Sequence, residues 1–494
     1  MIALSAWAFA SPMGAAPDDD YHLVSIWCST GNGSFCQPGS ADSTRFVPEA
    51  VLLSPCFAFF STESAACQNT LDFETTELVE TMRGNFVNAY PPLYYSVMSI
   101  FVSDDAHFSV MAMRLFNVVL FVALTTALYV LLPVTRRPAL VWGWLITTMP
   151  LGVFLISSNN PSGWAVVGVG SAWLALLSFY EARNQTVRWI SALLVVVAVL
   201  MAAGSRGDSA LYVVGALGVA AILAFENTRR FWLLSLLPLT MILISAAFFF
   251  SARQTSAGIN GFGGQEAGPA AEQAVTTSDS LAGFGLLAYN LLNAPSLWTG
   301  AFGGWALGWF DTPIPASVLF LGTAVFVGVG FLGLAVLTWR KAFVVASVGF
   351  VLWALPTYVL TQGGDKVGEQ VQPRYILPLL VLLGGLLVVQ VGRKKFSLGR
   401  IQSTAVVIAL SAANLVALHM NMRRYITGND VPGWNLNAGV EWFWSGAPAP
   451  MVVWAVGSLA FAGLVTILAR EMTIIGAVAS DVDDDEKALH PVSA

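Results

Sequence analysis

Three carboxylates and a histidine follow the first apolar segment of the chain, in the sequence Pro17-Asp-Asp-Asp-Tyr-His22. Asp18 and His22 are four residues apart, so they would share one face of a helical turn. A carboxylate here could accept a proton from a hydroxyl group, or could position a divalent cation such as Mg²⁺ or Mn²⁺. The alternative is structural, because aspartates at the start of a helix satisfy its free amide groups. We predict Asp18, Asp19 and His22 as catalytic residues and as the candidate ligands if a metal is required.

A second set of polar residues could bind a phosphorylated sugar. A guanidinium group grips phosphate through paired hydrogen bonds, which makes Arg206 and Arg374 candidates for that role. The structural alternative is that these arginines extend to lipid headgroups or pair with Asp208 or Asp365. The amides of Asn159 and Asn160 could bind sugar hydroxyls, although an Asn-Asn-Pro-Ser-Gly run also favours a turn. The predicted substrate-binding residues are Arg206, Asp208, Arg374, Lys366, Tyr90, Asn159 and Asn160.

The elements that must position these residues are membrane helices. Of the 494 residues, 56% are hydrophobic and 11% are charged, with a mean hydropathy of +0.69. Most apolar runs are roughly 16–25 residues long, enough to cross about 30 Å of hydrocarbon. The net charge of -6 and the lack of a basic face exclude nucleic acid as a partner. We predict an all-α polytopic membrane protein with about 12 transmembrane helices and a large first extracytoplasmic loop.

The chain divides into six regions on this interpretation. The first transmembrane helix lies in residues 1–14, and an extracytoplasmic loop subdomain occupies 15–107. Transmembrane helices two to seven fill 108–251, and a second outer loop with re-entrant or interfacial helices covers 252–313. Helices eight to twelve fill 314–469, and an acidic cytoplasmic tail ends the chain at 470–494. Basic residues gather in alternate connections, which should be cytoplasmic, so the Asp18 region should lie outside.

The cysteines support this orientation. Cys28, Cys36, Cys56 and Cys67 all lie in the first outer loop. Disulfides persist in oxidising compartments, and four cysteines allow three pairings, of which proximity favours Cys28–Cys36 and Cys56–Cys67. A zinc site is the competing interpretation.

Two further patterns in the outer regions predict structure or binding. The alternation of acidic and apolar residues in Asp72–Gly84 predicts a helix. Two arginines and three tryptophans in the last outer loop could form a sugar-stacking surface, or an aromatic belt at the membrane interface. These five residues are Arg423, Arg424, Trp434, Trp442 and Trp444.

Several of these motifs resemble one family. Pro17-Asp18-Asp19-x-x-His22 resembles the PDE-x-x-H signature of an actinobacterial and streptococcal membrane family catalogued as domain of unknown function 2142. The Tyr90–Tyr95, Asn160–Gly163 and Arg374-Tyr-x-x-Pro378 patches are similar to its other recurring patches, and the resemblance covers roughly residues 1–420. This sequence has Asp19 where the family usually has Glu, which leaves open whether Asp18 or Asp19 is the reacting carboxylate.

The resemblance also implies a function. The family looks like a relative of the GT-C glycosyltransferases, multi-span enzymes that take a sugar from a polyprenyl phosphate outside the membrane. In those enzymes an acidic residue of the first outer loop serves as catalytic base or metal partner. We therefore expect a GT-C-like transferase in a bacterial plasma membrane of actinobacterial type, acting on an extracytoplasmic glycan, glycolipid or protein. The alternatives are a transporter or flippase of lipid-linked sugars, and an envelope glycan polymerase or ligase.

Overall fold

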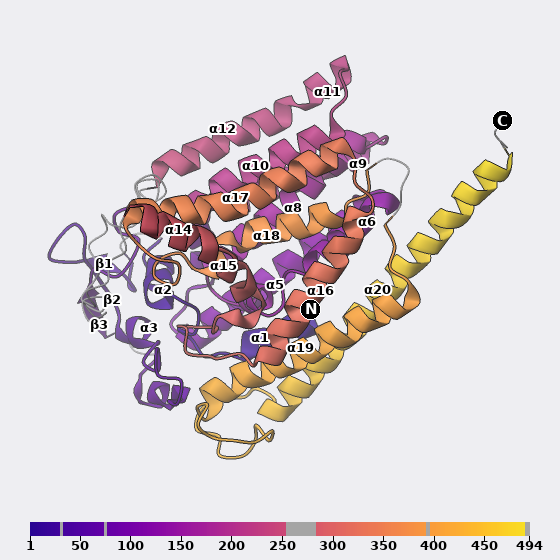
Figure 1. Cartoon of the computed structure of the whole chain (residues 1–494). Helices are drawn as coiled ribbons and strands as arrows, with labels where there is room; N and C mark the ends of the chain where they lie inside the picture. Colours follow the sequence, from indigo (N-terminus) through magenta and orange to yellow (C-terminus); the bar gives the residue numbers. More distant parts are fainter. Residues whose placement is uncertain (30–32, 74–76, 253–282, 392–395, 490–494) are drawn as a thin grey trace.

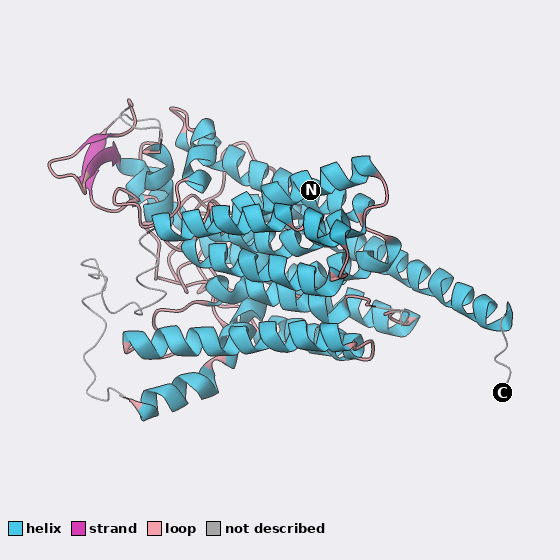
Figure 2. Ribbon diagram, turned by 90° about the horizontal axis from the view of Figure 1, so that it is seen from above, coloured by secondary structure: helices cyan, strands magenta, loops and turns pink. Residues whose placement is uncertain are grey.

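The computed structural model describes residues 1–29, 33–73, 77–252, 283–391 and 396–489, with side chains described up to residue 475. The described chain is mostly helical, and its long helices form one bundle (Figure 1). A small sheet lies at one end of this bundle, and the last part of the C-terminal helix projects from the other end (Figure 2).

The helices are, in chain order, α1 (Ile2–Phe9), α2 (Asp19–Trp27), α3 (Glu49–Leu53), α4 (Leu93–Met98), α5 (Ala106–Leu131), α6 (Arg137–Leu145), α7 (Leu151–Ile156), α8 (Pro161–Glu181), α9 (Gln185–Ala203), α10 (Gly207–Ala224), α11 (Arg229–Leu234), α12 (Leu236–Ser251), α14 (Phe284–Asn293), α15 (Pro295–Thr299), α16 (Ala316–Leu334), α17 (Trp339–Gly363), α18 (Pro373–Val388), α19 (Arg400–Ile426) and α20 (Pro450–Leu489). Shorter turns are η1 (Ala65–Thr70), η2 (Ser99–Phe101), η3 (Val134–Arg136) and the π-helical η4 (Gly300–Gly304).

Nine helices among the described residues are long and apolar enough to cross a membrane: α5, α8, α9, α10, the continuous pair α11–α12, α16, α17, α19 and α20 up to Ile475. The predicted count of twelve is not confirmed. Helix α1 has eight residues and is about 12 Å long, and α18 has sixteen and is about 24 Å long. The apolar run 139–157, long enough for one span, is divided into α6 and α7, because Pro150 has no N–H to continue a helix.

Close packing around α8 holds the bundle together. All of its membrane-length window is buried, and its composition is rich in Gly, Ala and Ser. A Cβ atom at Gly168 would lie 2.5 Å from the carbonyl oxygen of Ala198 in α9. A Cβ at Gly143 of α6 would likewise lie 2.8 Å from the Cα of Gly385 in α18. Small residues therefore let these helix backbones approach closely, as is usual in membrane bundles.

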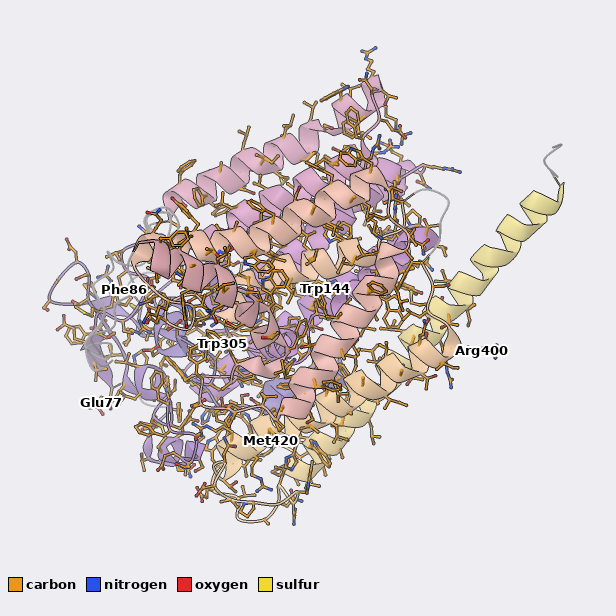
Figure 3. The ribbon with its side chains drawn as sticks, in the orientation of Figure 1. Glu77, Phe86, Trp144, Trp305, Arg400 and Met420 are labelled. Atoms are coloured by element: carbon orange, nitrogen blue, oxygen red, sulfur yellow. A yellow bond between two sulfur atoms is a disulfide. The ribbon has the colours of Figure 1, made fainter. Side chains whose placement is uncertain are left out.

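The predicted cytoplasmic and outer residues separate to opposite ends of the bundle. Arg136, after α5, forms an ion pair of 2.6 Å with Glu181 at the end of α8. Figure 3 shows Arg400, at the start of α19, at this side of the molecule, and Glu77 and Phe86 at the opposite side. The arrangement agrees with the alternation of basic connections, which predicts that the sheet end faces outward.

The segment between α1 and α5, predicted to lie outside and called the outer region below, contains a three-stranded antiparallel sheet in the order β1 (Gln37–Pro38), β2 (Arg45–Pro48) and β3 (Leu78–Thr81). The prediction of a helix over Asp72–Gly84 is therefore wrong for the β3 residues, while residues 74–76 lie outside the described chain. Residues 78–81 form a strand because they pair with β2. In addition, Glu80 of β3 accepts hydrogen bonds from Ser40 and Thr44 in the β1–β2 turn. Such cross-strand contacts outweigh a weak local preference.

Both predicted disulfides are confirmed. Cys28 pairs with Cys36, which ties the end of α2 to the start of the sheet, and Cys56 pairs with Cys67. All four thiols are used in these bonds, so the competing interpretation of a zinc site is wrong.

A buried ion pair attaches the outer region to α19. Arg424 and Asp311 are 2.7 Å apart with both side chains almost fully buried. The same guanidinium donates to the backbone carbonyls of Phe57 and Glu63 in the disulfide-bonded region. Arg423 is also buried and donates to two loop carbonyls. The two arginines are thus structural, and they do not form the sugar-stacking surface that the sequence suggested.

The three tryptophans of the last outer loop differ in their exposure. Trp442 and Trp444 are buried, whereas Trp434 is 61% exposed and lies against His419 and Trp454. Only Trp434 of the predicted three could meet a sugar or a lipid headgroup at the surface.

We predict that Arg424→Leu lowers the free energy of unfolding by about 3–5 kcal/mol, because it leaves the Asp311 carboxylate buried and unpaired. The melting midpoint of the detergent-solubilised protein measures the effect. Arg400→Leu, at the exposed start of the same helix, is the matched control and should change stability by less than about 0.5 kcal/mol. Equal midpoints for the two variants would contradict a stabilising role for the pair.

We also predict that replacing Cys28 and Cys36 with serine loosens the outer region. Closing a loop of this length, a sequence separation of 8 residues, stabilises by about 2–3 kcal/mol in the chain-entropy treatment. Cleavage of the loop at low protease concentration should then become about 100-fold faster, since it follows the population of the open form. Reduced wild-type protein is the control and should be cleaved at least as fast; an unchanged rate in the variant would refute the prediction.

Candidate functional site

Asp18 lies in the turn before α2, in a left-handed backbone conformation (φ 62°) that aspartate tolerates better than most residues. Its carbonyl oxygen accepts the N–H groups of Tyr21 and His22 and so begins the helix. Its carboxylate makes no capping hydrogen bond to the helix. The structural alternative considered for this residue, an N-cap side chain, therefore does not apply, and the carboxylate is available for other contacts.

The carboxylate of Asp18 contacts Arg374, which lies 356 positions later at the start of α18. The Arg374 Nη2 atom is 2.5 Å from Asp18 Oδ2, and its Nη1 donates to the carbonyl of Pro17 at 3.0 Å. The side chain of Asn160, at the start of α8, donates to the same Pro17 carbonyl at 2.8 Å. Arg374 is only 3% exposed, whereas the Asp18 side chain is 32% exposed. Three distant segments thus meet at one turn.

Arg206, which precedes α10, lies beside Arg374. It pairs with Asp208 through two hydrogen bonds of 2.9 and 2.8 Å. The guanidinium carbon of Arg206 is 4.5 Å from the centre of the Tyr375 ring, and that of Arg374 is 5.0 Å from the same ring. Cation–π attraction to one shared ring therefore keeps the two guanidinium groups together despite their like charge.

A third arginine comes from the loop after β3. Arg83 contacts Asp18 Oδ1 at 3.2 Å and Asp20 Oδ2 at 2.7 Å, and its guanidinium lies over the ring of Tyr21. The six charged residues Asp18, Asp20, Asp208, Arg83, Arg206 and Arg374 are called the charge cluster below. Within it, three carboxylates balance three guanidinium groups.

The charge cluster keeps Asp18 ionised. Burial alone would raise the pKa of this carboxyl, but the charge of Arg374, with a smaller contribution from Arg83, outweighs burial. The pKa of Asp18 therefore lies well below its usual range. In this state Asp18 is a weak base, and it strengthens only when its partners turn away.

Asp19 has the opposite environment. It is 1% exposed, its Oδ2 accepts the N–H of Ala16 at 3.0 Å, and its Oδ1 has no hydrogen-bond partner among the described residues. Burial raises the pKa of Asp19 to about 7, although the nearby charge of Arg114 opposes the shift. Arg114 itself donates to backbone carbonyls of Ala8, Ser11 and Pro12 and so fixes the chain that leads into the turn.

His22 is fully buried behind Asp18. Its Nδ1 is 2.9 Å from the hydroxyl of Tyr95, while its Nε2 has no hydrogen-bond partner among the described residues. Burial lowers the pKa of His22 to about 3, although the charge of Asp18 opposes the shift. The imidazole is therefore neutral at physiological pH, and it can accept or donate a hydrogen bond without adding charge to the site.

The three residues predicted as metal ligands do not fit a divalent cation in this arrangement. Both oxygens of Asp18 are engaged by arginines, and Asp19 Oδ2 is engaged by a backbone amide. Among the described residues no group of three His, Cys, Asp or Glu side chains is arranged to hold a metal ion. Guanidinium charges next to Asp18 would also repel a cation.

Tyr90, Asn159 and Lys366 are the remaining predicted binding residues. Tyr90 lies between His22 and Arg206, with its ring centre 5.3 Å from the imidazole and 5.8 Å from the guanidinium carbon. Asn159 is fully buried and donates to the carbonyl of Val110, so it shapes the turn instead of presenting an amide at the surface. Lys366 lies in the α17–α18 loop, where its backbone N–H donates to Glu369.

Sequence reasoning did not name Arg83, Tyr95 or Tyr375 as site residues. Tyr375 follows Arg374 directly, and Tyr95 ends the Tyr90–Tyr95 patch, so both lie in motifs that had already been noticed. Arg83 has no comparable signal, because only the fold of the sheet brings it to Asp18.

Together, the bundle and the charge cluster define a polytopic helical membrane protein with a polar site at one end of its helices. The chain belongs to the family described as predicted membrane protein, DUF2142, whose model matches residues 1–383. The matched region contains every residue of the charge cluster, and it confirms the family that the motifs suggested. No curated protein and no solved structure matches the chain.

We predict that Asp19→Asn changes how stability depends on pH. A carboxyl with a raised pKa stabilises the fold in its protonated form, so this stability is present below about pH 4 and is lost as the pH rises toward 7. Asparagine cannot ionise, so the variant should lack this loss. The test compares melting midpoints of wild type and variant at pH 4–8.

The difference between the two melting profiles is the measured quantity, because His22 and all other titrating groups are common to both proteins. Its expected form is a gain for the variant that grows between pH 4 and 7 and then stays constant. Parallel profiles would show that Asp19 titrates normally.

Proposed function

We propose that this protein is a GT-C-like glycosyltransferase that moves a sugar from a polyprenyl-phosphate donor to an envelope acceptor on the outer face of a bacterial plasma membrane. The observation that carries the proposal is the 2.5 Å contact between Arg374 and Asp18. It brings a phosphate-binding side chain and a proton-accepting side chain to one point. Both lie at the sheet end of the bundle, which the distribution of basic residues predicts to be outside.

Arg206 and Arg374, which both lie near the Tyr375 ring, would bind the donor phosphate. Guanidinium groups recognise phosphate oxygens through paired, charge-assisted hydrogen bonds. Arg206 keeps Asp208 as a counterion, whereas the counterion of Arg374 is the partly exposed Asp18. An incoming phosphate would therefore replace Asp18 on Arg374 at small electrostatic cost, since one anion takes the position of another.

This exchange would activate the base. Once Arg374 faces the phosphate, its charge no longer holds the Asp18 pKa down to the same extent, and the carboxylate becomes a better proton acceptor. The acceptor hydroxyl oxygen then attacks the anomeric carbon of the sugar and gives its proton to Asp18. The bond between that carbon and the phosphate oxygen breaks, and the electron pair leaves with polyprenyl phosphate, whose charge the arginines stabilise.

Asp19 and His22 support Asp18 in this scheme. Asp19 is buried and holds the turn through the amide of Ala16, so it acts as a positioning residue. His22 is neutral and fixed by Tyr95, and it forms the inner wall of the turn without competing for the proton. Of the two carboxylates that sequence reasoning left open, we therefore assign the base to Asp18.

We expect Asp18→Asn to reduce sugar transfer about 100- to 10,000-fold, the usual contribution of a general base. The assay follows labelled sugar from a polyprenyl-phosphate donor into envelope material in membranes that contain the variant at wild-type level. Asp42→Asn is the control: it removes an exposed carboxylate of the β1–β2 turn, outside the charge cluster, and should change the rate within about fivefold.

Full transfer by Asp18→Asn would contradict the assignment of the base. The alternative of a transporter or flippase makes a different prediction for purified protein in liposomes. There, movement of labelled lipid across the bilayer without a new glycosidic bond would contradict the transferase as a whole.

A further inference from the structure

A groove lies on the side of the bundle between α10 and the α11–α12 pair, at the end of α10 that is farther from the charge cluster. It has a volume of about 470 Å³, within the range of about 300–1,000 Å³ that binding sites for small molecules occupy. Tyr180 at the end of α8 and Arg340 at the start of α17 complete its walls. Figure 1 shows α12 along one edge of the bundle with α10 beside it, and the lining residues Trp232 and Leu239 are more than half exposed. The groove therefore opens toward the lipid that surrounds a membrane protein.

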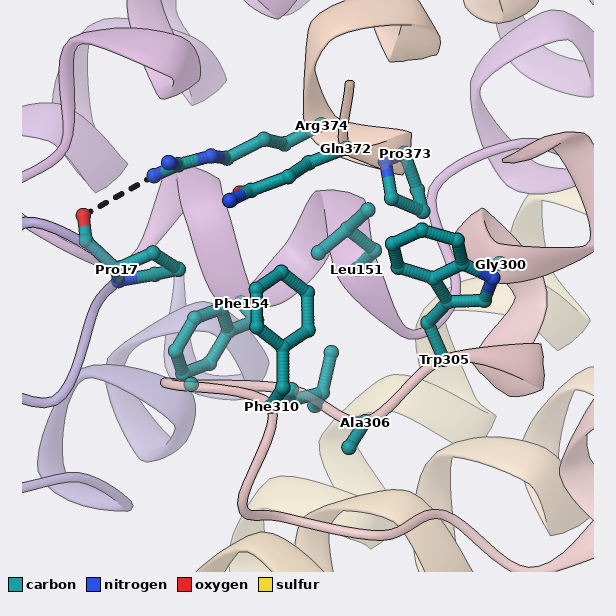
Figure 4. A pocket seen from close by; sticks show the side chains of 12 residues that line it. Pro17, Leu151, Phe154, Gly300, Trp305, Ala306, Phe310, Gln372, Pro373 and Arg374 are labelled. Atoms are coloured by element: carbon teal, nitrogen blue, oxygen red, sulfur yellow. Dashed lines mark hydrogen bonds between the residues drawn. The ribbon is translucent and has the colours of Figure 1, made fainter. Parts of the chain in front are cut away.

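The space beside Arg374 is much smaller than this groove. Figure 4 shows it between Leu151, Trp305 and Pro373. Its volume of about 20 Å³ is room for about one water molecule. Of these two spaces, only the groove between α10 and α12 can take a hydrocarbon chain.

The walls of the groove are apolar, and a glycine keeps them apart. A Cβ atom at Gly218 of α10 would meet nothing within 4 Å. The hydroxyls of Tyr180 and Ser235 are 3.0 Å apart and hydrogen-bond to each other, so neither requires a polar ligand. The remaining lining is aliphatic or aromatic apart from Arg340. A ligand of this groove must therefore be a hydrocarbon over most of its length.

The groove is about as deep as one leaflet of a bilayer. Along the α11–α12 pair its lining extends from Trp232 to Ile242, which is ten residues, or about 15 Å at the rise of a helix. Half of a hydrocarbon core about 30 Å thick has the same length. Trp232 and Arg340 lie at the end that the basic connections predict to be cytoplasmic, so the leaflet is the inner one.

Arg340 forms the polar end of the groove. Its Nη1 atom donates to the carbonyl of Phe225 at 2.8 Å, and its guanidinium carbon is 5.9 Å from the centre of the Phe225 ring. The positive-inside rule places basic residues at this end of the bundle, but it does not require one of them to line a groove. The position of Arg340 therefore needs a further explanation.

Two more arginines lie next to the groove. Arg188 and Arg230 both donate to the carbonyl of Ala182, at 2.7 and 3.0 Å. Glu226, in the α10–α11 connection, is exposed. Among the described residues, neither these two arginines nor Arg340 forms an ion pair with a carboxylate. The cytoplasmic end of the groove is thus positive and would attract an anion.

The bilayer supplies a molecule that fits both parts of the groove. Empty space along apolar walls loses dispersion contacts, and these walls offer water few partners, so a lipid chain is the natural filling. Lipid chains are as apolar as the walls, so the chain alone does not select one lipid over another. The headgroup makes the selection, and guanidinium groups favour a phosphate that carries a net negative charge.

We infer that this groove binds an anionic phospholipid of the inner leaflet, with one acyl chain between α10 and α12 and the phosphate at Arg340. Basic pockets between helices on the cytoplasmic side commonly bind anionic headgroups. The inference does not depend on transferase activity. It adds a ligand to the helix that carries Asp208 of the charge cluster at its other end.

Replacing Arg340 tests the headgroup contact. Radiolabelled phosphatidylglycerol should bind full-length Arg340→Gln in detergent about fivefold more weakly than wild type, the usual contribution of one arginine near anionic lipid. Arg340→Lys keeps the charge and should bind within about twofold of wild type. Arg400→Gln is the matched control, because Arg400 is exposed at the same end of the bundle (Figure 3) and does not line the groove. It should also bind within about twofold of wild type.

Filling the groove tests the position of the chain. Gly218→Leu places a side chain where the acyl chain would lie, and it should weaken binding about fivefold because the displaced chain loses packing contacts. Gly215→Leu is the matched control: Gly215 is on the same helix and also has open space at its Cβ, but it does not line the groove. Both changes replace glycine with a better helix former, so neither should prevent folding.

Photolabelling of the wild-type protein needs no variant. Phosphatidylglycerol with a diazirine in the middle of one acyl chain should label residues 217–222 and 238–242, and excess unlabelled phosphatidylglycerol should prevent the labelling. Phosphatidylcholine with the same chains should compete more weakly, because its choline group cancels the charge of its phosphate. Inorganic phosphate at the same concentration should not compete, because it leaves the apolar part of the groove unfilled.

Several results would overturn the inference. Equal competition by the two lipids would show a general contact with the bilayer, and displacement by inorganic phosphate would show a site for the free anion. Unchanged affinity in Arg340→Gln or in Gly218→Leu, or labelling confined to other segments, would also contradict it. Loss of labelling when the protein dimerises would place a second copy in the groove. Weaker binding in both variants, with normal binding in both controls, would support the inference whether or not sugar transfer is observed.

Discussion

The buried guanidinium of Arg374 is the constraint on which the arrangement of the site depends. A cation that is only 3% exposed destabilises a fold unless an anion and hydrogen-bond acceptors surround it. Asp18 supplies the anion, and the carbonyl of Pro17 supplies an acceptor that Asn160 also holds. The N-terminal turn, the start of α8 and the start of α18 must therefore come together for α18 to pack at all. Folding and assembly of the site are in this sense one event.

The same constraint explains why the side-chain types of the residues indicated members of the charge cluster, whereas their spacing in the sequence did not. Charged groups are costly near a bilayer unless they are paired, so Asp18, Arg206 and Arg374 were credible candidates from their types alone. Their partners were harder to foresee. The fold of the sheet brings Arg83 to Asp18, and the side chains of Arg374 and Asn160 both donate to the backbone carbonyl of Pro17, an acceptor that no sequence motif identifies. The part of the site made by side-chain charge was predictable, and the part made by tertiary hydrogen bonds was not.

A similar division applies to the fold. Long apolar runs identified the nine helices of the described chain that can cross a membrane, because hydropathy depends on composition alone. The additional spans required a continuous helix where the chain does not form one. Pro150 separates α6 from α7, and α1 and α18 are continuous but have only 8 and 16 residues. Strand β3 was mistaken for a helix because its partner β2 lies more than thirty residues earlier, outside any local window.

The disulfide-bonded region is attached to the bundle by a residue that lies beyond the part of the chain matched by the family model. The family match ends at residue 383, yet Arg424, which neutralises Asp311 and holds the carbonyls of Phe57 and Glu63, belongs to α19 beyond that end. A chain shortened to the matched part would retain every member of the charge cluster. It would leave the buried Asp311 carboxylate without its Arg424 partner. The region that the family model matches therefore excludes a residue that holds the disulfide-bonded region in place, and chimaeras between relatives should exchange the first outer loop and the end of α19 together.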